Sequence, residues 1–317
     1  MTTVTSPGAS ARVGAGIVRG HRSDVRGAVV TALLLLALLL GVLSLVALTV
    51  TLLVDGSSVL TQRGGQFLTS PLNSDAAIAG VWQGIRGTIT LSIIVAIVAF
   101  PLGVGCAVWL ENYARDNWFA RMVSINIRNL AGVPSIVYGL LGLAVFVKLL
   151  GADGSGGITG GRTVISGGLT LAVLVLPIII ITAQEALRAV PSGISEGAFA
   201  LGATRWETIR HHLLPNSLPG ILMGTVLSLA RAAGEAAPLL VVGAVTGVFF
   251  VGAQGFFEQI YSGRFTAMPM IIFSWARLPA GQGWAVNAAA AGFVLLLLVI
   301  FVNAVAIYFR NRYEQKW

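Results

Sequence analysis

The sequence has very little charge and almost no cysteine for its length. Only 10% of its 317 residues are Asp, Glu, Lys or Arg, against roughly 25% in soluble domains. So few charged groups cannot cover a water-facing surface, which excludes a soluble globular protein. The one cysteine, Cys106, lies in an apolar run, and a single thiol excludes a disulfide framework or a cysteine-based metal site within the chain.

Several catalytic and binding signatures are missing as well. The only lysines are Lys148 and Lys316, and no GxxxxGK[ST] phosphate loop is present, so this ATP-binding motif is absent. No paired carboxylates or nucleophile–base set point to an enzyme. The positive charges are spread between apolar segments, which disfavours a nucleic-acid binder. Adjacent His211 and His212 would point to different faces of a helix, which disfavours a metal chelate.

What the sequence does have is long apolar runs. Hydrophobic residues make up 56% of the chain, and the mean hydropathy is +0.87. About 20 helical residues cross the hydrocarbon core of a bilayer. Six runs are long enough, at 28–54, 85–110, 130–150, 169–187, 218–246 and 285–309. We therefore predict an all-α polytopic membrane protein with six transmembrane helices.

The positions of the basic residues predict its orientation. Thirteen of the 20 Lys and Arg residues lie in the N-terminal tail, the loops after the second and fourth runs, and the C-terminus, whereas six lie in or beside the other loops. This bias puts both termini in the cytoplasm. We expect a disordered cytoplasmic tail (1–28), a first span with an external loop (29–84) that has room for a short surface helix, and a core with five further spans (85–317). The aromatic-rich segment 247–284 is expected outside.

A polar segment, EGAFALGATRWETIRHHLLP at 196–215, separates the fourth and fifth runs. Its pattern predicts a helix, a break at a glycine, and a second helix exposed on one side of the membrane. It resembles the EAA loop of ABC importer permeases, whose pattern is E-A-A, three residues, G, nine residues, I-x-L-P. Two positions depart from that pattern, Gly197 and His212. The matching residues are Glu196, Ala198, Gly202, Leu214 and Pro215.

The resemblance implies that this loop docks on a cytoplasmic ATPase, through the matching residues and Arg205. The alternative is an ordinary cytosolic loop between two spans.

Two charges lie inside the fifth predicted span, Arg231 and Glu235. A charged residue at the bilayer centre costs about 2.5–3.5 kcal/mol, so it needs a function or a partner. Spaced four apart, the two would lie on one helical face. The planar Arg231 fork suits an oxyanion, and Glu235 would hold it and favour a protonated oxyanion. The alternative is a structural ion pair. Pro238 is expected to break or bend the helix shortly after.

A second polar stretch precedes the third span, at 128–139. Pro134 and two glycines predict an unwound turn there, with the hydroxyls of Ser135 and Tyr138 available to a substrate. The alternative is a plain helix start, since Ser and Pro are common near helix N-termini.

From about Gly87 to the C-terminus, segments such as NLAGVPSIVYGLLGL and LARAAGEAAPLL are similar to the permeases of phosphate-specific ABC importers. MPMIIFSWARLP, followed by a last span and a short basic tail, resembles the PstA type more than its PstC partner. The resemblance implies a type I ABC importer permease fold in the inner membrane of a prokaryote. Phosphate would pass along Arg231, Glu235, Ser135 and Tyr138.

The implied partners are a PstC-type permease, two PstB-type ATPase subunits that bind ATP and Mg, and a PstS-type phosphate-binding protein. This chain would bind no cofactor of its own and would contact membrane lipid but no nucleic acid. Three alternatives stay open: a permease for another oxyanion such as sulfate or molybdate, the PstC-like partner subunit, and an ion-coupled secondary transporter.

Overall fold

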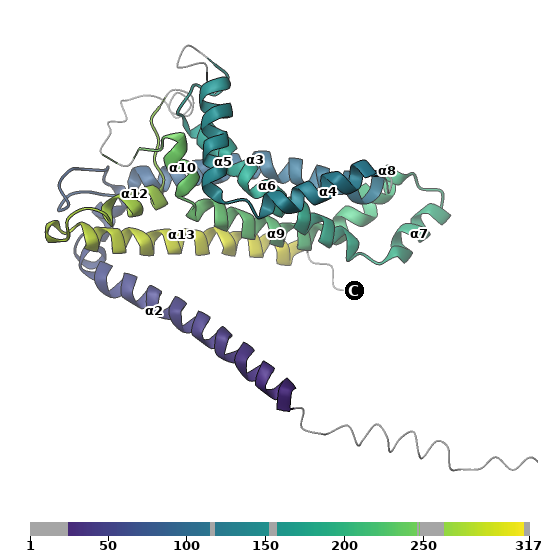
Figure 1. Ribbon diagram of the computed structural model, residues 1–317, viewed down its shortest axis with the longest axis horizontal. Coiled ribbons are helices and arrows are strands. Elements are labelled where there is room, and N and C mark those ends of the chain that lie inside the picture. Colours follow the sequence, from purple (N-terminus) through teal and green to yellow (C-terminus); the bar gives the residue numbers. More distant parts are fainter. Residues whose placement is uncertain (1–24, 115–117, 152–156, 246, 248–262, 314–317) are drawn as a thin grey trace, which may run out of the picture. The chain divides into compact units, whose positions relative to one another are not determined.

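A computed structural model describes residues 25–114, 118–151, 157–245, 247 and 263–313, shown as coloured ribbon in Figure 1. The chain divides into two compact units, residues 1–51 and 52–317. Most of the predicted cytoplasmic tail (1–24) and much of the aromatic-rich external segment (248–262) lie outside the described residues. Within the described ranges all regular secondary structure is helical.

The described part of the first unit is the first part of one long helix, α2 (Val25–Thr69). Its leucines, such as Leu34 and Leu38, are more than half exposed. A helix that is apolar all round belongs in lipid or among other spans, so this part fits the predicted first span. The predicted external segment 55–84 begins as helix, since α2 continues to Thr69 with a kink at Arg63 (φ −142°, ψ 28°).

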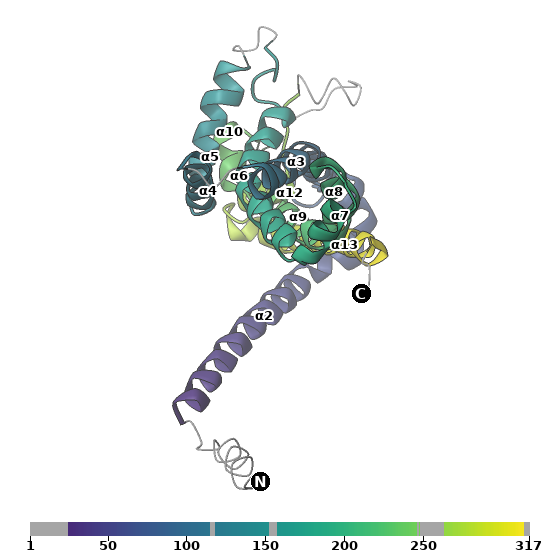
Figure 2. The same cartoon turned by 90° about the vertical axis from the view of Figure 1, so that its right-hand side faces the viewer.

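The second unit is built on four long helices that lie side by side in Figure 1 and are seen end-on in Figure 2. They are α3 (Trp82–Val108), α6 (Val164–Arg188), α9 (Leu214–Gly234) and α13 (Trp284–Tyr313). Helices satisfy their own backbone hydrogen bonds, which lipid requires, and small residues let them approach closely. A Cβ on Gly103 of α3 would lie 2.6 Å from the Ile179 side chain of α6, so these two helices meet at the glycine backbone.

Shorter elements complete the second unit. They are η1 (Trp109–Tyr113), α4 (Trp118–Ala131), α5 (Ser135–Gly142), η2 (Leu143–Leu149), α7 (Ser192–Ala200), α8 (Arg205–Thr208), η4 (Ile209–Leu213), α10 (Ala237–Val242), α12 (Met268–Trp275) and η5 (Ala280–Gln282). Of these, η1, η2 and η4 are π-helical turns, which hold one more residue per turn than an α-helix.

The number of spans agrees with the prediction once the third is treated as bent. Five described helices are long and apolar enough to cross a membrane, and a sixth span results if α4 and the α5–η2 segment count as one, bent by 105°. The fourth span begins earlier than predicted, because α6 starts at Val164 and the Thr163 side chain caps its N-terminus. The all-α polytopic fold is confirmed.

Far from α7 and α8, at the opposite end of the second unit in Figure 1, an elbow joins three segments. We call it the Arg63 elbow. The Arg63 guanidinium donates hydrogen bonds to the carbonyls of Ala76 and Ala77, and to Oδ1 of Asn287 on α13 at 2.8 Å. Buried Asn287 in turn donates to the Ala76 carbonyl at 2.8 Å. A partly buried cation therefore satisfies carbonyls that no helix pairs.

Candidate functional site

The predicted third span is broken at residues 132–134, between α4 and α5. Pro134 disfavours helical geometry at the preceding residue and lacks a donor N–H, so the helix ends before it. The Tyr138 hydroxyl reaches back across the break and donates to the Leu130 carbonyl at 2.7 Å. The predicted unwound turn is therefore present, but its tyrosine hydroxyl is engaged with the Leu130 carbonyl, which also accepts from the Val133 N–H at 3.0 Å.

The predicted fifth span is broken too, and this corrects the expected position of Glu235. Helix α9 ends at Gly234, Glu235 is extended (φ −82°, ψ 120°), and α10 starts at Ala237 with Pro238 in its first turn. Arg231 and Glu235 therefore do not share a continuous helical face. Pro238 accounts for the restart, because proline is well tolerated in the first turn of a helix but not in its interior.

The segments beyond the two breaks pack against each other. A Cβ on Gly139 of α5 would lie 2.8 Å from Cα of Pro238 on α10, and another on Gly142 would lie 2.0 Å from the Thr170 hydroxyl of α6. Only glycine permits such close backbone approaches. Helix α5 is thus held between α10 and α6, and the two breaks are held in fixed relation to each other.

Arg231 and Glu235 remain partners across the break in α9. Nε of Arg231 lies 3.5 Å from Oε1 of Glu235, and their side chains are 43% and 21% exposed. Among the residues that the structure describes, no other carboxylate pairs with Arg231. Because a guanidinium carries five donor hydrogens in a rigid fork, most of them stay available to an anion here.

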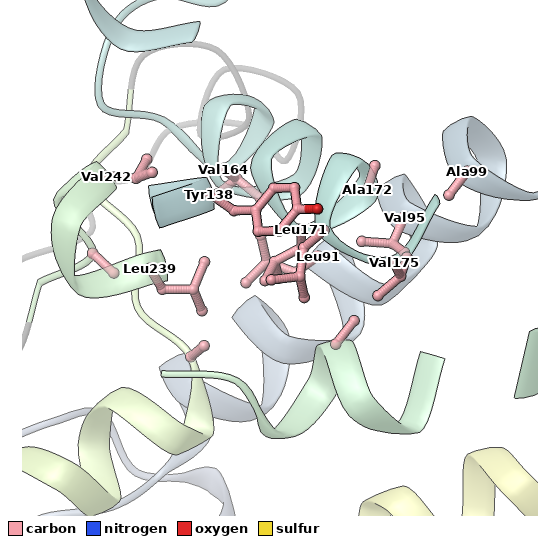
Figure 3. Close-up of a cluster of buried hydrophobic side chains, with 14 of the residues drawn as sticks. Leu91, Val95, Ala99, Tyr138, Val164, Leu171, Ala172, Val175, Leu239 and Val242 are labelled. Carbon is pink, nitrogen blue, oxygen red and sulfur yellow. The ribbon is translucent and has the colours of Figure 1, made fainter. Parts of the chain in front are cut away.

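The structure pairs Arg231 with Glu235 and places Tyr138 in the same apolar cluster as Ala232, the neighbour of Arg231. The Tyr138 ring is buried there among side chains of α3 and α6, including Leu91 and Leu171 (Figure 3). Ser135 is half-buried in the first turn of α5. No described contact joins Ser135 to the other three, so the structure gives it no shared site with them.

The predicted loop 196–215 has the expected helix–glycine–helix form. Helix α7 ends with Gly202 in the left-handed region (φ +84°). The Gly202 N–H donates to the Phe199 carbonyl at 3.0 Å, and the Ala203 N–H donates to the Ala198 carbonyl at 3.1 Å. These two bonds form a Schellman motif, which needs a left-handed residue at this position and so explains the glycine.

The second half of the loop starts at a capping box. The Thr204 hydroxyl accepts from the Glu207 backbone N–H, and the Glu207 carboxylate accepts from the Thr204 backbone N–H at 2.8 Å. This pair of bonds fixes the N-terminus of α8. Around it, three large apolar side chains stand in solvent: Phe199 (49% exposed), Leu201 (91%) and Trp206 (53%).

The six predicted coupling residues have different surroundings. Glu196 is exposed on α7, Ala198 is buried, and Gly202 forms the turn. Leu214 and Pro215 are half-buried and open α9. Arg205 is exposed but bonds to its own chain, donating to the Asn112 carbonyl on η1 at 3.0 Å. Sequence reasoning missed this partner, which lies 93 residues away along the chain.

These features define a class of protein: a polytopic helical membrane protein with charges at a broken span and an exposed helical loop at one end. Residues 99–316 match the family described as "Binding-protein-dependent transport system inner membrane component". The match covers more than half of the chain, and the protein belongs to this family of membrane permease subunits.

Two relatives and one solved structure extend the comparison. The chain is 32% identical over 232 residues to the phosphate transport system permease protein PstA of Mycobacterium leprae, covering 73% of this chain and 70% of that protein. It is 37% identical over 198 residues to the probable ABC transporter permease protein YqgH of Bacillus subtilis, covering 60% of this chain and 63% of that protein, less than two thirds of its length.

A crystal structure of a bacterial alginate ABC transporter, in complex with its pentasaccharide-bound periplasmic protein, contains a chain of similar fold. The TM-score is 0.64 at 15% identity, covering 93% of this chain and 98% of that one. At this identity the likeness concerns the fold alone.

Proposed function

We propose that this chain is a PstA-type permease subunit that passes inorganic phosphate through the membrane, powered by a separate ATPase. The observation that carries the proposal is the Arg231–Glu235 pair at the break in α9, with the Arg231 side chain 43% exposed and most of its donors available. The phosphate transport relative supports the same substrate. An intramembrane charge that is not fully neutralised favours a role in substrate passage.

The pair suits hydrogen phosphate in particular. Arg231 would bind two phosphate oxygens through its planar fork. Glu235, an acceptor when ionised, would take a hydrogen bond from the proton that phosphate keeps at neutral pH. Tyr138 would contribute mainly by packing, because its hydroxyl is engaged with the Leu130 carbonyl. Ser135 would act elsewhere along the route, at the entrance to α5.

Energy would enter through the loop 196–215. Two PstB-type ATPase subunits would bind ATP and Mg. They would contact the loop through its exposed apolar side chains, Phe199, Leu201 and Trp206. Surfaces of this kind, apolar and exposed on a soluble loop, are typical of protein interfaces. Closure of the ATPase dimer on ATP would pull the loops together and change which side of the membrane the path faces.

This chain covers the Arg231 side chain only in part, which leaves an exposed side for the remaining partners. A PstC-type permease would cover its exposed side and complete the path, and a PstS-type protein would deliver phosphate from outside. The positive-inside bias supports cytoplasmic termini and a cytoplasmic loop 196–215, in the inner membrane of a prokaryote.

The test is uptake of radiolabelled phosphate by phosphate-starved cells that lack this gene. We expect wild-type protein to restore uptake in the presence of excess sulfate, and Arg231→Ala to fail although it reaches the membrane. Arg277→Ala, which removes an exposed arginine that lies over the Phe273 ring just after α12, is the matched control and should restore uptake.

Restoration of uptake by Arg231→Ala would mean that the arginine has a structural role and is not needed for phosphate passage. Competition by sulfate or molybdate would assign another oxyanion to the same path. Uptake that survives without the ATPase subunits would instead indicate an ion-coupled carrier.

A further inference from the structure

We infer that Arg205 is a positioning residue that transmits movement of the loop 196–215 to the end of the second span. This inference rests on the proposed coupling function of the loop. The resemblance to the EAA loop places Arg205 in the ATPase contact, whereas the structure turns its side chain toward its own chain. Its partners lie on η1, the π-helical end of the helix that begins as α3.

Arg205 holds η1 through two contacts. Its Nη1 donates to the Asn112 carbonyl at 3.0 Å, and its guanidinium carbon lies 5.9 Å from the centre of the Tyr113 ring. Helix geometry ends at Tyr113, because Ala114 is extended (φ −62°, ψ 129°). The Asn112 carbonyl therefore belongs to the last turn, whose carbonyls have no helical N–H to accept from, and a charged donor there is favourable.

The backbone that carries Arg205 is fixed as well. Arg205 is the first residue of α8, directly after the Thr204 cap, and the Thr204–Glu207 capping box sets its direction. One residue before the cap, Ala203 closes the Schellman motif at the end of α7. A movement of α7 is therefore passed to Arg205 through the hydrogen-bonded turn at Gly202 and the capping box rather than through a loose linker.

A second tie connects the same end of η1 to the fourth span. Glu111 accepts two hydrogen bonds from Arg188 at 2.7 Å each and one from Gln184 at 2.8 Å. Arg188 and Gln184 lie in the last turns of α6. Glu111 is only 15% exposed, and a bidentate pair in a partly buried site is stronger and more directional than an ordinary surface salt bridge.

These ties form a continuous route from the loop to the charged pair. The loop holds η1 through Arg205, η1 holds α6 through Glu111, and α3 and α6 both pack along α9, which carries Arg231. Loss of a surface arginine that lies on no such route would have little effect on the coupling of ATP hydrolysis to transport. We therefore expect loss of Arg205 to separate ATP hydrolysis from transport, rather than to remove the ATPase.

The first experiment measures phosphate taken up per ATP hydrolysed by the complete complex in proteoliposomes. Arg205→Ala should lower this ratio about tenfold, within the usual range of coupling between sites, with the ATPase subunits still bound. Arg205→Lys should recover much of it, because Lys also donates to a carbonyl and lies over aromatic rings. Arg210→Ala removes the same charge from the same loop and should leave the ratio unchanged, because Arg210 is exposed and makes no hydrogen bond or ion pair with a described residue.

Tyr113→Leu adds a double-mutant cycle. If Arg205 acts through η1, the double variant should be no worse than Arg205→Ala alone, because contacting residues are not additive. Additive losses, an unchanged ratio in Arg205→Ala, or release of the ATPase subunits would each overturn the inference.

A second experiment does not depend on the substrate. Spin labels at Gly193→Cys, where a side chain meets nothing within 4 Å, and at Trp109→Cys, which is 42% exposed, report the separation of α7 and η1 in a Cys106→Ser background. Adding a non-hydrolysable ATP analogue to the full complex should leave that separation unchanged when Arg205 is present and change it in Arg205→Ala. A change with Arg205 present would overturn the inference. If the labels keep this separation in wild type and lose it in Arg205→Ala, but the complex transports no phosphate, the inference stands and only the proposed substrate is contradicted.

Discussion

Arg231 and Glu235 lie 3.5 Å apart, Nε to Oε1, although the end of a helix separates them. Arg231 belongs to the last turn of α9, and Glu235 is the first extended residue after it. The Glu235 N–H donates to the Ala232 carbonyl at 3.3 Å, the backbone then leaves the helix, and the Glu235 carboxylate still reaches the guanidinium. The turn of the backbone at the end of α9 therefore holds the two side chains together.

Glu235→Gln tests whether the carboxylate selects a protonated oxyanion. Glutamine keeps the shape but loses the charge, so the hydrogen bond from phosphate weakens and the preference for phosphate over sulfate should fall about two- to tenfold. The preference is measured as the inhibition of labelled phosphate uptake by added sulfate. Glu185→Gln, an exposed carboxylate near the end of α6, is the control, and an unchanged preference in Glu235→Gln would remove the selective role.

Gly202→Ala tests the left-handed turn between α7 and α8. There is open space for the methyl group, but φ is +84°, and the strain should destabilise the loop by about 1–2 kcal/mol. We expect weaker retention of the ATPase subunits in a pull-down and slower uptake. Gly197→Ala, inside α7 and also in open space, should be neutral or slightly favourable to the helix. Equal behaviour of the two variants would contradict the role of the turn.

Gly139→Ala tests the contact between α5 and α10. The new Cβ would lie 2.8 Å from Cα of Pro238, and backbone atoms cannot move aside as a side chain does, so we expect a loss of about 1–3 kcal/mol. Thermal unfolding in detergent would show it as a lower Tm, together with reduced uptake. Gly105→Ala on α3 is the control: its new Cβ would have nothing within 4 Å, so this variant should keep the wild-type Tm. A wild-type Tm in Gly139→Ala would mean that α5 and α10 are not in close contact.

Arg63→Met tests the Arg63 elbow. Methionine fills similar space but leaves the acceptors at Ala77 and Asn287 unpaired, which should cost about 1–3 kcal/mol. The measurement is again the Tm in detergent. Arg277→Met removes an arginine that lies 5.0 Å over the Phe273 ring and should cost less than about 1 kcal/mol. If both variants unfold at the same temperature, the elbow contributes no stability.

The spans could be predicted from the sequence because lipid imposes a strong pattern: some 20 apolar residues are needed to cross, and breaks need proline or glycine. Pro134 and Pro238 marked both broken spans. The extension of α2 to Thr69 could not be predicted, because residues 55–69 are polar and nothing in their composition separates an exposed helix from a loop.

The site was predicted less completely than the fold. The spacing of Arg231 and Glu235 suggested one helical face, and the structure places Glu235 beyond the helix end, where the pair survives because the backbone turns. The position of Gly202 was explained only by its hydrogen bonds. The contact of Arg205 with η1 had no local signal, because spacing rules describe neighbours within a few turns and this pair is joined by tertiary packing alone.

The π-helical turn η4, between α8 and α9, has a consequence for the angular setting of the loop. A π-helical turn takes up one more residue than an α-helical turn in nearly the same rotation, so the turn at Ile209–Leu213 absorbs an extra residue without changing the direction in which α8 faces relative to α9. If these residues wound as ordinary α-helix instead, the extra residue would add about 100° of rotation and would turn Arg205 and Trp206 about a quarter-turn around the axis. The loop would keep its whole sequence and yet face the wrong way.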